Sequence, residues 1–260
     1  MEKHRDKMIK VYQGAYNYLL EIKPDEISEE ELQKYFVVDS NDFSTLEEIF
    51  DHFIGSAQNY QSMPNIIKYD LRKNEIKKML ADFDVQIVKK MDASDLYYQF
   101  REKFNVTSKD SKQNSWYKWS RAVVDSAKFL SDFKDADDFK DFVNGFNYNQ
   151  ITRMALPLLM EKKIHGVGFA LACNTLKDLG FLDYPKPDVH LLDVCSELDL
   201  AKRNQIDVFE CVVKMANECK VTPYKVDKII WLICSGRFYL DDINVGGHKK
   251  EFIEYMKAKM

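Results

Sequence analysis

Residues 162–172 read Lys162-Lys163-Ile164-His165-Gly166-Val167-Gly168-Phe169-Ala170-Leu171-Ala172. This stretch predicts two helices joined by a tight turn, because glycines permit a positive φ and leave backbone N–H groups exposed. Such N–H groups, together with the positive end of the second helix, suit one phosphate group. Many tight turns between helices need glycine for steric reasons alone, so the turn by itself leaves both interpretations open. The candidate phosphate site consists of Lys162, Lys163, His165, Gly166, Val167 and Gly168.

A second stretch, Lys186-Pro187-Asp188-Val189-His190-Leu191, brings a carboxylate to the expected start of the next helix. Asp188 comes 22 residues after Gly166, across one helix and one loop, so the chain can return to place it near the turn. An aspartate that follows a proline at a helix start is also a typical N-cap. The position allows a capping role and a chemical role at once.

The composition predicts a soluble and mostly helical protein. The chain is 45% hydrophobic and 31% charged, and only 9 Gly and 6 Pro in 260 residues leave little room for a turn-rich β architecture. The chain holds no apolar run of about 18 residues that would predict a membrane span, and its charged N-terminus leads into no apolar secretory segment. The five cysteines lack C-x-x-C spacing, which favours reduced thiols inside the cell. We therefore expect an intracellular protein without a metal or other cofactor.

The net charge of −4 is unevenly distributed along the chain. Residues 64–121 hold 13 Lys and Arg against 8 Asp and Glu, whereas the remainder holds 25 against 34. A basic middle segment on an acidic protein can meet a phosphate backbone. A solvated charged face explains the same counts equally well.

Apolar residues recur at helical spacing and predict about ten helices, with no internal repeat and no flexible linker. Gly180 and Gly236 should follow helix ends. Pro157 should kink the helix of residues 149–163 or mark its effective start. Helix starts are expected at Ser28, at the capping box Ser44-Thr45-Leu46-Glu47, at Asp207 and at Thr222-Pro223.

Trp116 and Trp119 share one face of a predicted helix with Val123, Ala127 and Leu130. The spacing favours packing of both tryptophans in the core. The sharper alternative is an aromatic platform for an extruded base, to which Tyr117 would also belong.

The pattern of residues 150–195 resembles the helix-hairpin-helix DNA glycosylase superfamily (HhH-GPD). In that family a Gly-x-Gly hairpin is followed, at about this distance, by a segment similar to Pro187-Asp188-Val189-His190. Phe53-Ile54-Gly55-Ser56-Ala57-Gln58 resembles the Ser-x-Gln segment of family members, whose glutamine reaches into the DNA. A surface position for Gln58 without such a role is the simpler interpretation.

The resemblance implies an all-α protein of two lobes with a DNA-binding cleft between them. Residues 1–50 and 189–260 would form one lobe, and residues 51–188 the other, with the helix-hairpin-helix at about 150–180. The expected partner is double-stranded DNA with a damaged or modified base, bound by a monomer. The base would be flipped out of the duplex, and ionised Asp188 would stabilise charge on the deoxyribose or activate water.

The chain departs from part of the family at Ala170. Members that also cleave the strand carry a nucleophilic lysine there. The resemblance therefore implies base hydrolysis without lyase activity, or lyase activity supplied by a lysine at another position. A non-enzymatic DNA-binding protein that uses the same hairpin is the runner-up interpretation, and a helical protein-interaction domain is the third.

Overall fold

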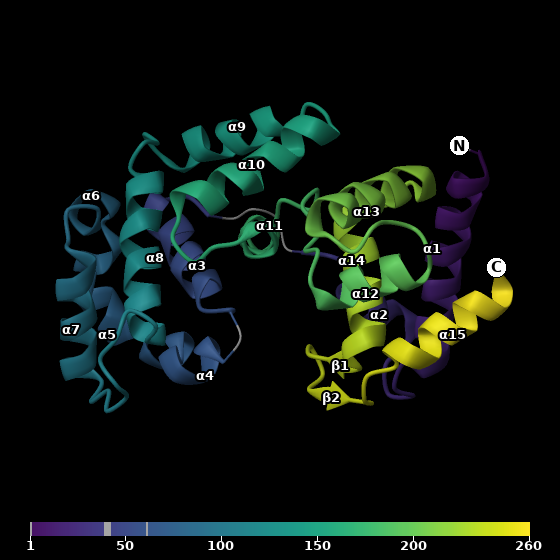
Figure 1. The fold of residues 1–260 in the computed structure, drawn as a ribbon, viewed down its shortest axis with the longest axis horizontal. Coiled ribbons are helices and arrows are strands. Elements are labelled where there is room, and N and C mark those ends of the chain that lie inside the picture. The colour runs from purple at the N-terminus through teal and green to yellow at the C-terminus, as the bar shows by residue number, and fades with distance from the viewer. Residues whose placement is uncertain (1, 39–42, 61) are drawn as a thin grey trace. The chain divides into compact units, whose positions relative to one another are not determined.

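The computed structural model describes residues 2–38, 43–60 and 62–260, and it is mostly helical, with 67% helix and 2% strand (Figure 1). The expectation of a helical protein is confirmed. The described residues form about 15 helices instead of ten, because several are single turns that apolar periodicity does not reveal.

The chain divides into two compact units. Unit 1 combines residues 1–40 with residues 180–260, and unit 2 is the continuous segment 41–179. The boundary expected at residue 50 would fall inside helix α3, and the boundary expected at residue 188 would fall at the N-cap of α12. α3 packs along its length on α8 and α11, so its first turn belongs with unit 2. Residues 180–188 belong to unit 1, where the N–H of Tyr224 donates to the carbonyl of Leu182.

Unit 2 is built around α8, which packs against α3, α6 and α7 (Figure 1). The core is rich in aromatic rings, and burying each ring contributes about 1.5–3 kcal/mol. The helices of unit 2 are α3 (Leu46–Ala57), α4 (Met63–Ile67), α5 (Tyr69–Met79), the 3₁₀ turn η1 (Ala81–Phe83), α6 (Val85–Val88), α7 (Ala93–Lys103), α8 (Ser115–Leu130), α9 (Ala136–Phe146), α10 (Gln150–Lys163) and α11 (Phe169–Asp178).

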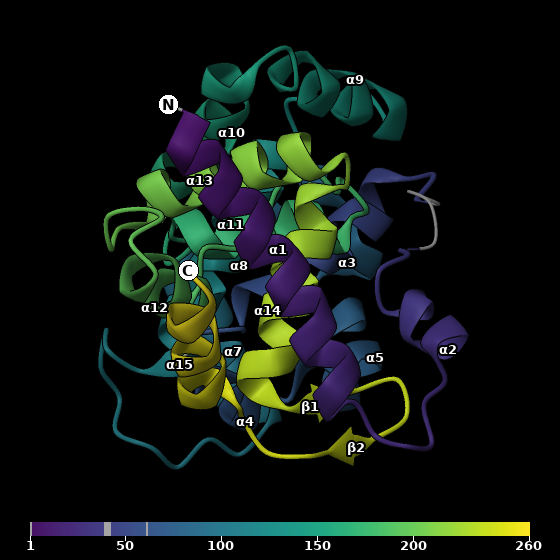
Figure 2. The same cartoon turned by 90° about the vertical axis from the view of Figure 1, so that its right-hand side faces the viewer.

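Unit 1 is held together by α1, which runs across α13 and α14 (Figure 2). Its apolar face is fully buried against them, Val11 and Leu19 included. The elements of unit 1 are α1 (Glu2–Ile22), α2 (Glu29–Lys34), α12 (Val189–Glu197), α13 (Gln205–Cys219), α14 (Pro223–Ser235), β1 (Arg237–Phe238), β2 (Ile243–Asn244) and α15 (Lys249–Lys259).

The capping signals locate most helix starts, with two shifts in register. Ser28 and Thr222 cap α2 and α14 as expected. The capping box of α3 joins Thr45 to Glu48, one residue later than predicted. The start predicted at Asp207 is wrong, since α13 is capped by Asn204, whose side chain accepts a hydrogen bond from the N–H of Asp207.

The predictions made from glycine and proline positions are confirmed in part. Gly180 and Gly236 follow helix ends with positive φ, as predicted. Pro157 lies inside α10, which begins seven residues earlier, at Gln150, and so does not mark its start. The short antiparallel ribbon of β1 and β2 was not predicted, because two-residue strands carry no periodic signal. Among the described residues no helix combines the length and the apolarity needed to cross a membrane.

Candidate functional site

The Gly-Val-Gly stretch connects α10 and α11 as a tight hairpin. Ile164, Val167 and Phe169 are buried and fix the turn in the core of unit 2, while Gly166 and Gly168 between them are exposed. The backbone N–H of His165 donates to the Asp125 carboxylate of α8 at 3.2 Å. The hairpin is therefore held by its apolar residues and presents its glycines outward.

Gly166 and Gly168 differ in backbone conformation. Gly166 has a φ of +78°, in the left-handed region that other residues rarely adopt. Gly168 has an ordinary φ of −81° and is the N-cap of α11, with no side chain to accept a hydrogen bond from the helix. A Cβ at either position would meet nothing within 4 Å. Packing within the chain therefore gives no steric reason for glycine at Gly168, and glycine is among the residues favoured at an N-cap.

The basic residues of the hairpin are accessible to a ligand. Lys162 and Lys163 are exposed, in the last turn of α10, and make no ion pair among the described residues. Burial lowers the pKa of His165, and the charges of Arg121 and Lys118 lower it further, against the opposing effect of Asp125. The imidazole is therefore neutral near pH 7, and the positive charge at the hairpin comes from the lysines.

Asp188 is the N-cap of α12, in unit 1. Its Oδ1 accepts hydrogen bonds from the N–H groups of His190 at 2.9 Å and Leu191 at 3.3 Å. The capping interpretation of Asp188 is confirmed. Among the described residues both hydrogen bonds to the carboxylate use Oδ1, which leaves Oδ2 available on a partly exposed side chain.

Asp188 lies among other ionisable groups. Burial lowers the pKa of His190, whereas the charge of Asp188 opposes that shift. The Nδ1 atom of His190 is buried with no hydrogen-bond partner in the described part of the chain. Burial also raises the pKa of the Cys234 thiol to about 12, with a smaller contribution from Asp188 in the same direction. The charge of Asp188 therefore acts on the pKa values of two neighbours, the neutral imidazole of His190 and the protonated thiol of Cys234.

Gln58 is buried, with 7% of its surface exposed, so the expected surface position is wrong. Its Oε1 accepts a hydrogen bond from the N–H of Tyr69 at 3.1 Å, at the start of α5. This bond satisfies one of the N–H groups that a helix start leaves without a partner. A structural role accounts for the side chain.

The core-packing interpretation of the tryptophans is confirmed. Trp116 and Trp119 are 1% and 0% exposed. Trp116 stacks on Phe104 with a ring separation of 5.2 Å, and the indole N–H of Trp119 donates to the carbonyl of Ile54 at 2.9 Å. Tyr117 is partly exposed and meets Tyr97 edge-on. Protein covers the faces of Trp116, so its ring offers no exposed surface for the alternative, an aromatic platform for an extruded base.

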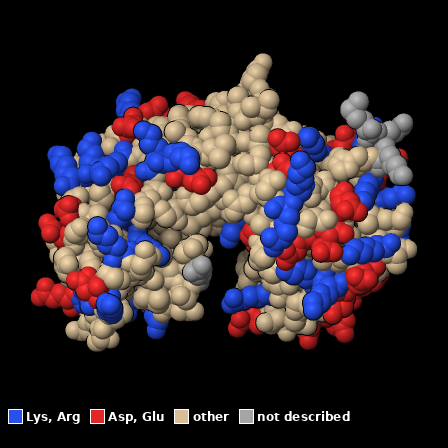
Figure 3. Space-filling model, viewed as in Figure 1, with Lys and Arg blue, Asp and Glu red and all other residues tan. Residues whose placement is uncertain are grey.

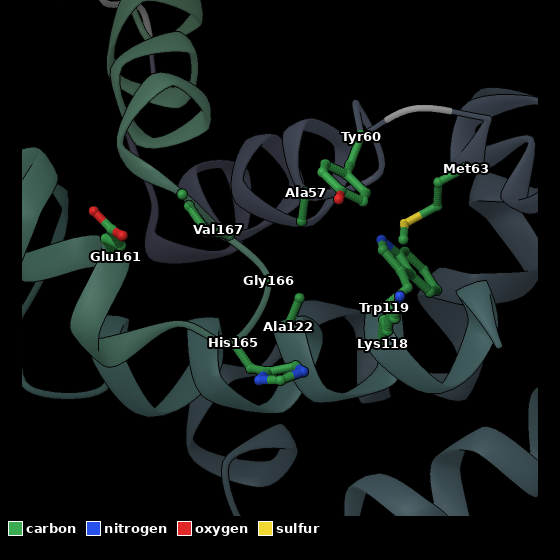
Figure 4. A pocket seen from close by; sticks show the side chains of 11 residues that line it. Ala57, Tyr60, Met63, Lys118, Trp119, Ala122, Glu161, His165, Gly166 and Val167 are labelled. Carbon is green, nitrogen blue, oxygen red and sulfur yellow. The ribbon is translucent and has the colours of Figure 1, made fainter. Parts of the chain in front are cut away.

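A cavity of about 370 Å³ opens beside the hairpin, entirely within unit 2 (Figure 4). Sequence reasoning singled out only Trp119 and the hairpin among its residues. The others carry no distinctive spacing and are brought together by packing of α3, α4 and α8. The cavity is lined by Ala57, Tyr60, Met63, Lys118, Trp119, Ala122, Glu161, His165, Gly166, Val167 and Gly168.

Charge on the surface is mixed. On the face seen in Figure 3, Lys and Arg lie among Asp and Glu and form no continuous basic patch. Two of the 13 basic residues of the segment 64–121 are in ion pairs among the described residues, Lys73 with Asp51 and Lys103 with Glu75. The basic middle segment is therefore neutralised in part.

Among the described residues, no group of three or more His, Cys, Asp and Glu side chains is placed to hold a metal ion. Comparisons of the chain with protein-family models, with curated proteins and with solved structures find no match.

Proposed function

We propose that the chain is an intracellular DNA glycosylase that removes a damaged or modified base by hydrolysis, with Asp188 as the catalytic carboxylate. The observation that carries the proposal is the exposed glycine turn at the N-terminus of α11. Gly168 keeps open a space that no part of the chain fills. The helix N-terminus behind it favours an anion, and a DNA backbone presents phosphates.

The hairpin would hold the strand through one phosphate. Its ligands would be backbone N–H groups at the start of α11, supplemented by the charges of Lys162 and Lys163. Because these contacts go to the backbone, they would position the DNA without reading its sequence. Binding should weaken steeply with salt, since each neutralised phosphate releases counterions.

Asp188 would act on the deoxyribose of the flipped nucleotide. Cleavage of the N-glycosidic bond develops positive charge on the sugar, and a fixed carboxylate stabilises that charge in the transition state. The cap through Oδ1 fixes the orientation of the group, and Oδ2 would face the reacting atoms. Hydrolysis transfers the sugar to water, and the base leaves with a proton. The side chain at Ala170 has no amine to replace the water.

The proposal is tested by measuring base release from a panel of duplexes that each carry one modified base. Wild type should release the base from at least one duplex, and Asp188→Asn should release it far more slowly. If wild type releases no base from any duplex, the enzymatic proposal is wrong.

The confirmed capping role of Asp188 favours a second candidate, a non-enzymatic DNA-binding protein. In that case the aspartate serves the fold alone. Such a protein would bind duplexes in a salt-sensitive way, release no base, and bind equally well after Asp188→Asn.

A further inference from the structure

The cavity beside the hairpin has the chemistry of a ligand site. Its volume of about 370 Å³ lies within the range of small-molecule pockets, which are mostly apolar with a few polar groups. Ala57, Met63, Trp119 and Ala122 provide an apolar surface. The indole of Trp119 is fixed by its hydrogen bond to Ile54, so this surface is rigid.

Four polar side chains that line the cavity have no partner in the part of the chain that the structure describes. The side chains of Tyr60, Lys118, Glu161 and His165 make no hydrogen bond or ion pair among the described residues. Donors and acceptors that line one cavity without partners among the described residues are available to a ligand.

Two rings stand on opposite sides of the cavity. Tyr60 and His165 face the space from different elements, with Gly166 between them and Trp119 beyond (Figure 4). Tyr60 is 47% exposed, although most aromatic rings of unit 2 are buried. Because burial lowers the pKa of His165, its ring is neutral and offers one donor and one acceptor. A flat, polar heterocycle can lie against two such rings and exchange hydrogen bonds with them.

The hairpin lines the cavity, and this position indicates the class of ligand. Gly166, Val167 and Gly168 line the cavity and also form the turn proposed to bind a phosphate. A group that enters the cavity therefore lies next to that phosphate. We infer that the cavity binds an unstacked nucleobase of the strand held by the hairpin, with Tyr60 as the ring on which it stacks. This inference rests on the proposed binding of DNA by the hairpin, and it is independent of base release.

The test compares the affinity of the full chain for two fluorescein-labelled duplexes, one fully paired and one with a single unpaired nucleotide. Stacking of one base on one aromatic side chain changes affinity by about tenfold or more. Wild type should bind the duplex with the unpaired nucleotide about tenfold more tightly. Tyr60→Ala should lose this preference and keep its affinity for the paired duplex.

Two further variants sharpen the result. Tyr60→Phe keeps the ring and should keep the preference. Tyr148→Ala removes an aromatic ring that is 86% exposed and lies outside the cavity, so it should bind both duplexes as wild type does. Thermal melting of Tyr60→Ala confirms that the variant is folded.

The inference is overturned if wild type shows no preference, if Tyr60→Ala keeps it, or if that variant weakens both complexes equally. Base release, measured in parallel, separates this failure from failure of the proposed function. If release and paired-duplex binding persist while the preference is absent, the cavity inference alone is wrong. If wild type binds no duplex, both are wrong.

Discussion

Asp188 combines a cap with a proposed catalytic charge, and two substitutions separate these roles. Asn keeps the side-chain oxygen that accepts from His190 and Leu191 and removes the charge. Ala removes both. Asparagine and aspartate cap helices about equally well, whereas replacing a cap by alanine costs about 1 kcal/mol. The negative charge at the N-terminus of α12 adds a further contribution of about 0.3–1 kcal/mol.

These magnitudes predict that the two variants lose different amounts of stability. Asp188→Ala should lower the free energy of unfolding by about 1–2 kcal/mol, since the cap and the charge are both lost. Asp188→Asn should lower it by less than about 1 kcal/mol, through the charge alone. A loss of 1 kcal/mol corresponds to a fall in melting temperature of about 2–4 °C for a domain of this size class. Urea unfolding and thermal melting measure both quantities.

The rate of base release, unlike the free energy of unfolding, should fall by a similar factor in the two variants. Both variants should lose activity by about 10²–10³, the usual cost of removing one group that stabilises developing charge. Single-turnover release from the best substrate of the duplex panel measures the rate. Equal stability of the two variants would refute the capping argument. Release by Asp188→Asn at the wild-type rate would refute the catalytic one.

Three further predictions follow from the hairpin and from His190. Gly168→Ala should change stability by less than about 1 kcal/mol, since φ is −81° and the new methyl meets nothing, yet weaken duplex binding at low salt. Gly166→Ala should destabilise by about 1–2 kcal/mol because φ is +78°, and urea unfolding with fluorescence anisotropy distinguishes the two variants. Borohydride treatment with an abasic duplex should trap no covalent adduct, since Ala170 provides no amine, and a strong adduct would contradict hydrolysis by water. Burial lowers the pKa of His190, so the unfolded chain binds a proton more readily than the folded one. The associated stability is present above about pH 6.5, the ordinary histidine pKa, and is lost as the pH falls through the lower folded pKa. The urea midpoint should therefore fall less between pH 7.5 and pH 5 in His190→Gln than in wild type, and equal falls would contradict this assignment.

Local signals in the sequence predict local structure well in this chain. Ser28, Thr222 and Gly236 mark helix ends because each acts on hydrogen bonds within a few residues. The spacing of Trp116 and Trp119 predicts their burial for the same kind of reason, since one face of α8 must meet the core. The single-turn helices and the ribbon of β1 and β2 leave no such mark.

The candidate site depends on contacts between distant residues, and these are harder to predict. Gln58 looks like an exposed glutamine after α3, and only the position of Tyr69 at the start of α5 explains its burial. The carboxylate of Asp125 accepts a hydrogen bond from the backbone N–H of His165, 40 residues later, and no sequence motif predicts this contact. The cavity around Tyr60 is assembled in the same way from α3, α4, α8 and the hairpin.

The division of the chain into units has a consequence for the order of folding. Unit 2 is continuous, so all of its residues are present once residue 179 has been synthesised. α1 is synthesised before unit 2, yet its partners α13 and α14 begin only at residues 205 and 223. The apolar face of α1, with Val11 and Leu19, therefore lacks its native partners until α13 and α14 have been synthesised. Aggregation of chains that end before α13 should accordingly depend on the apolar face of α1 rather than on the hairpin.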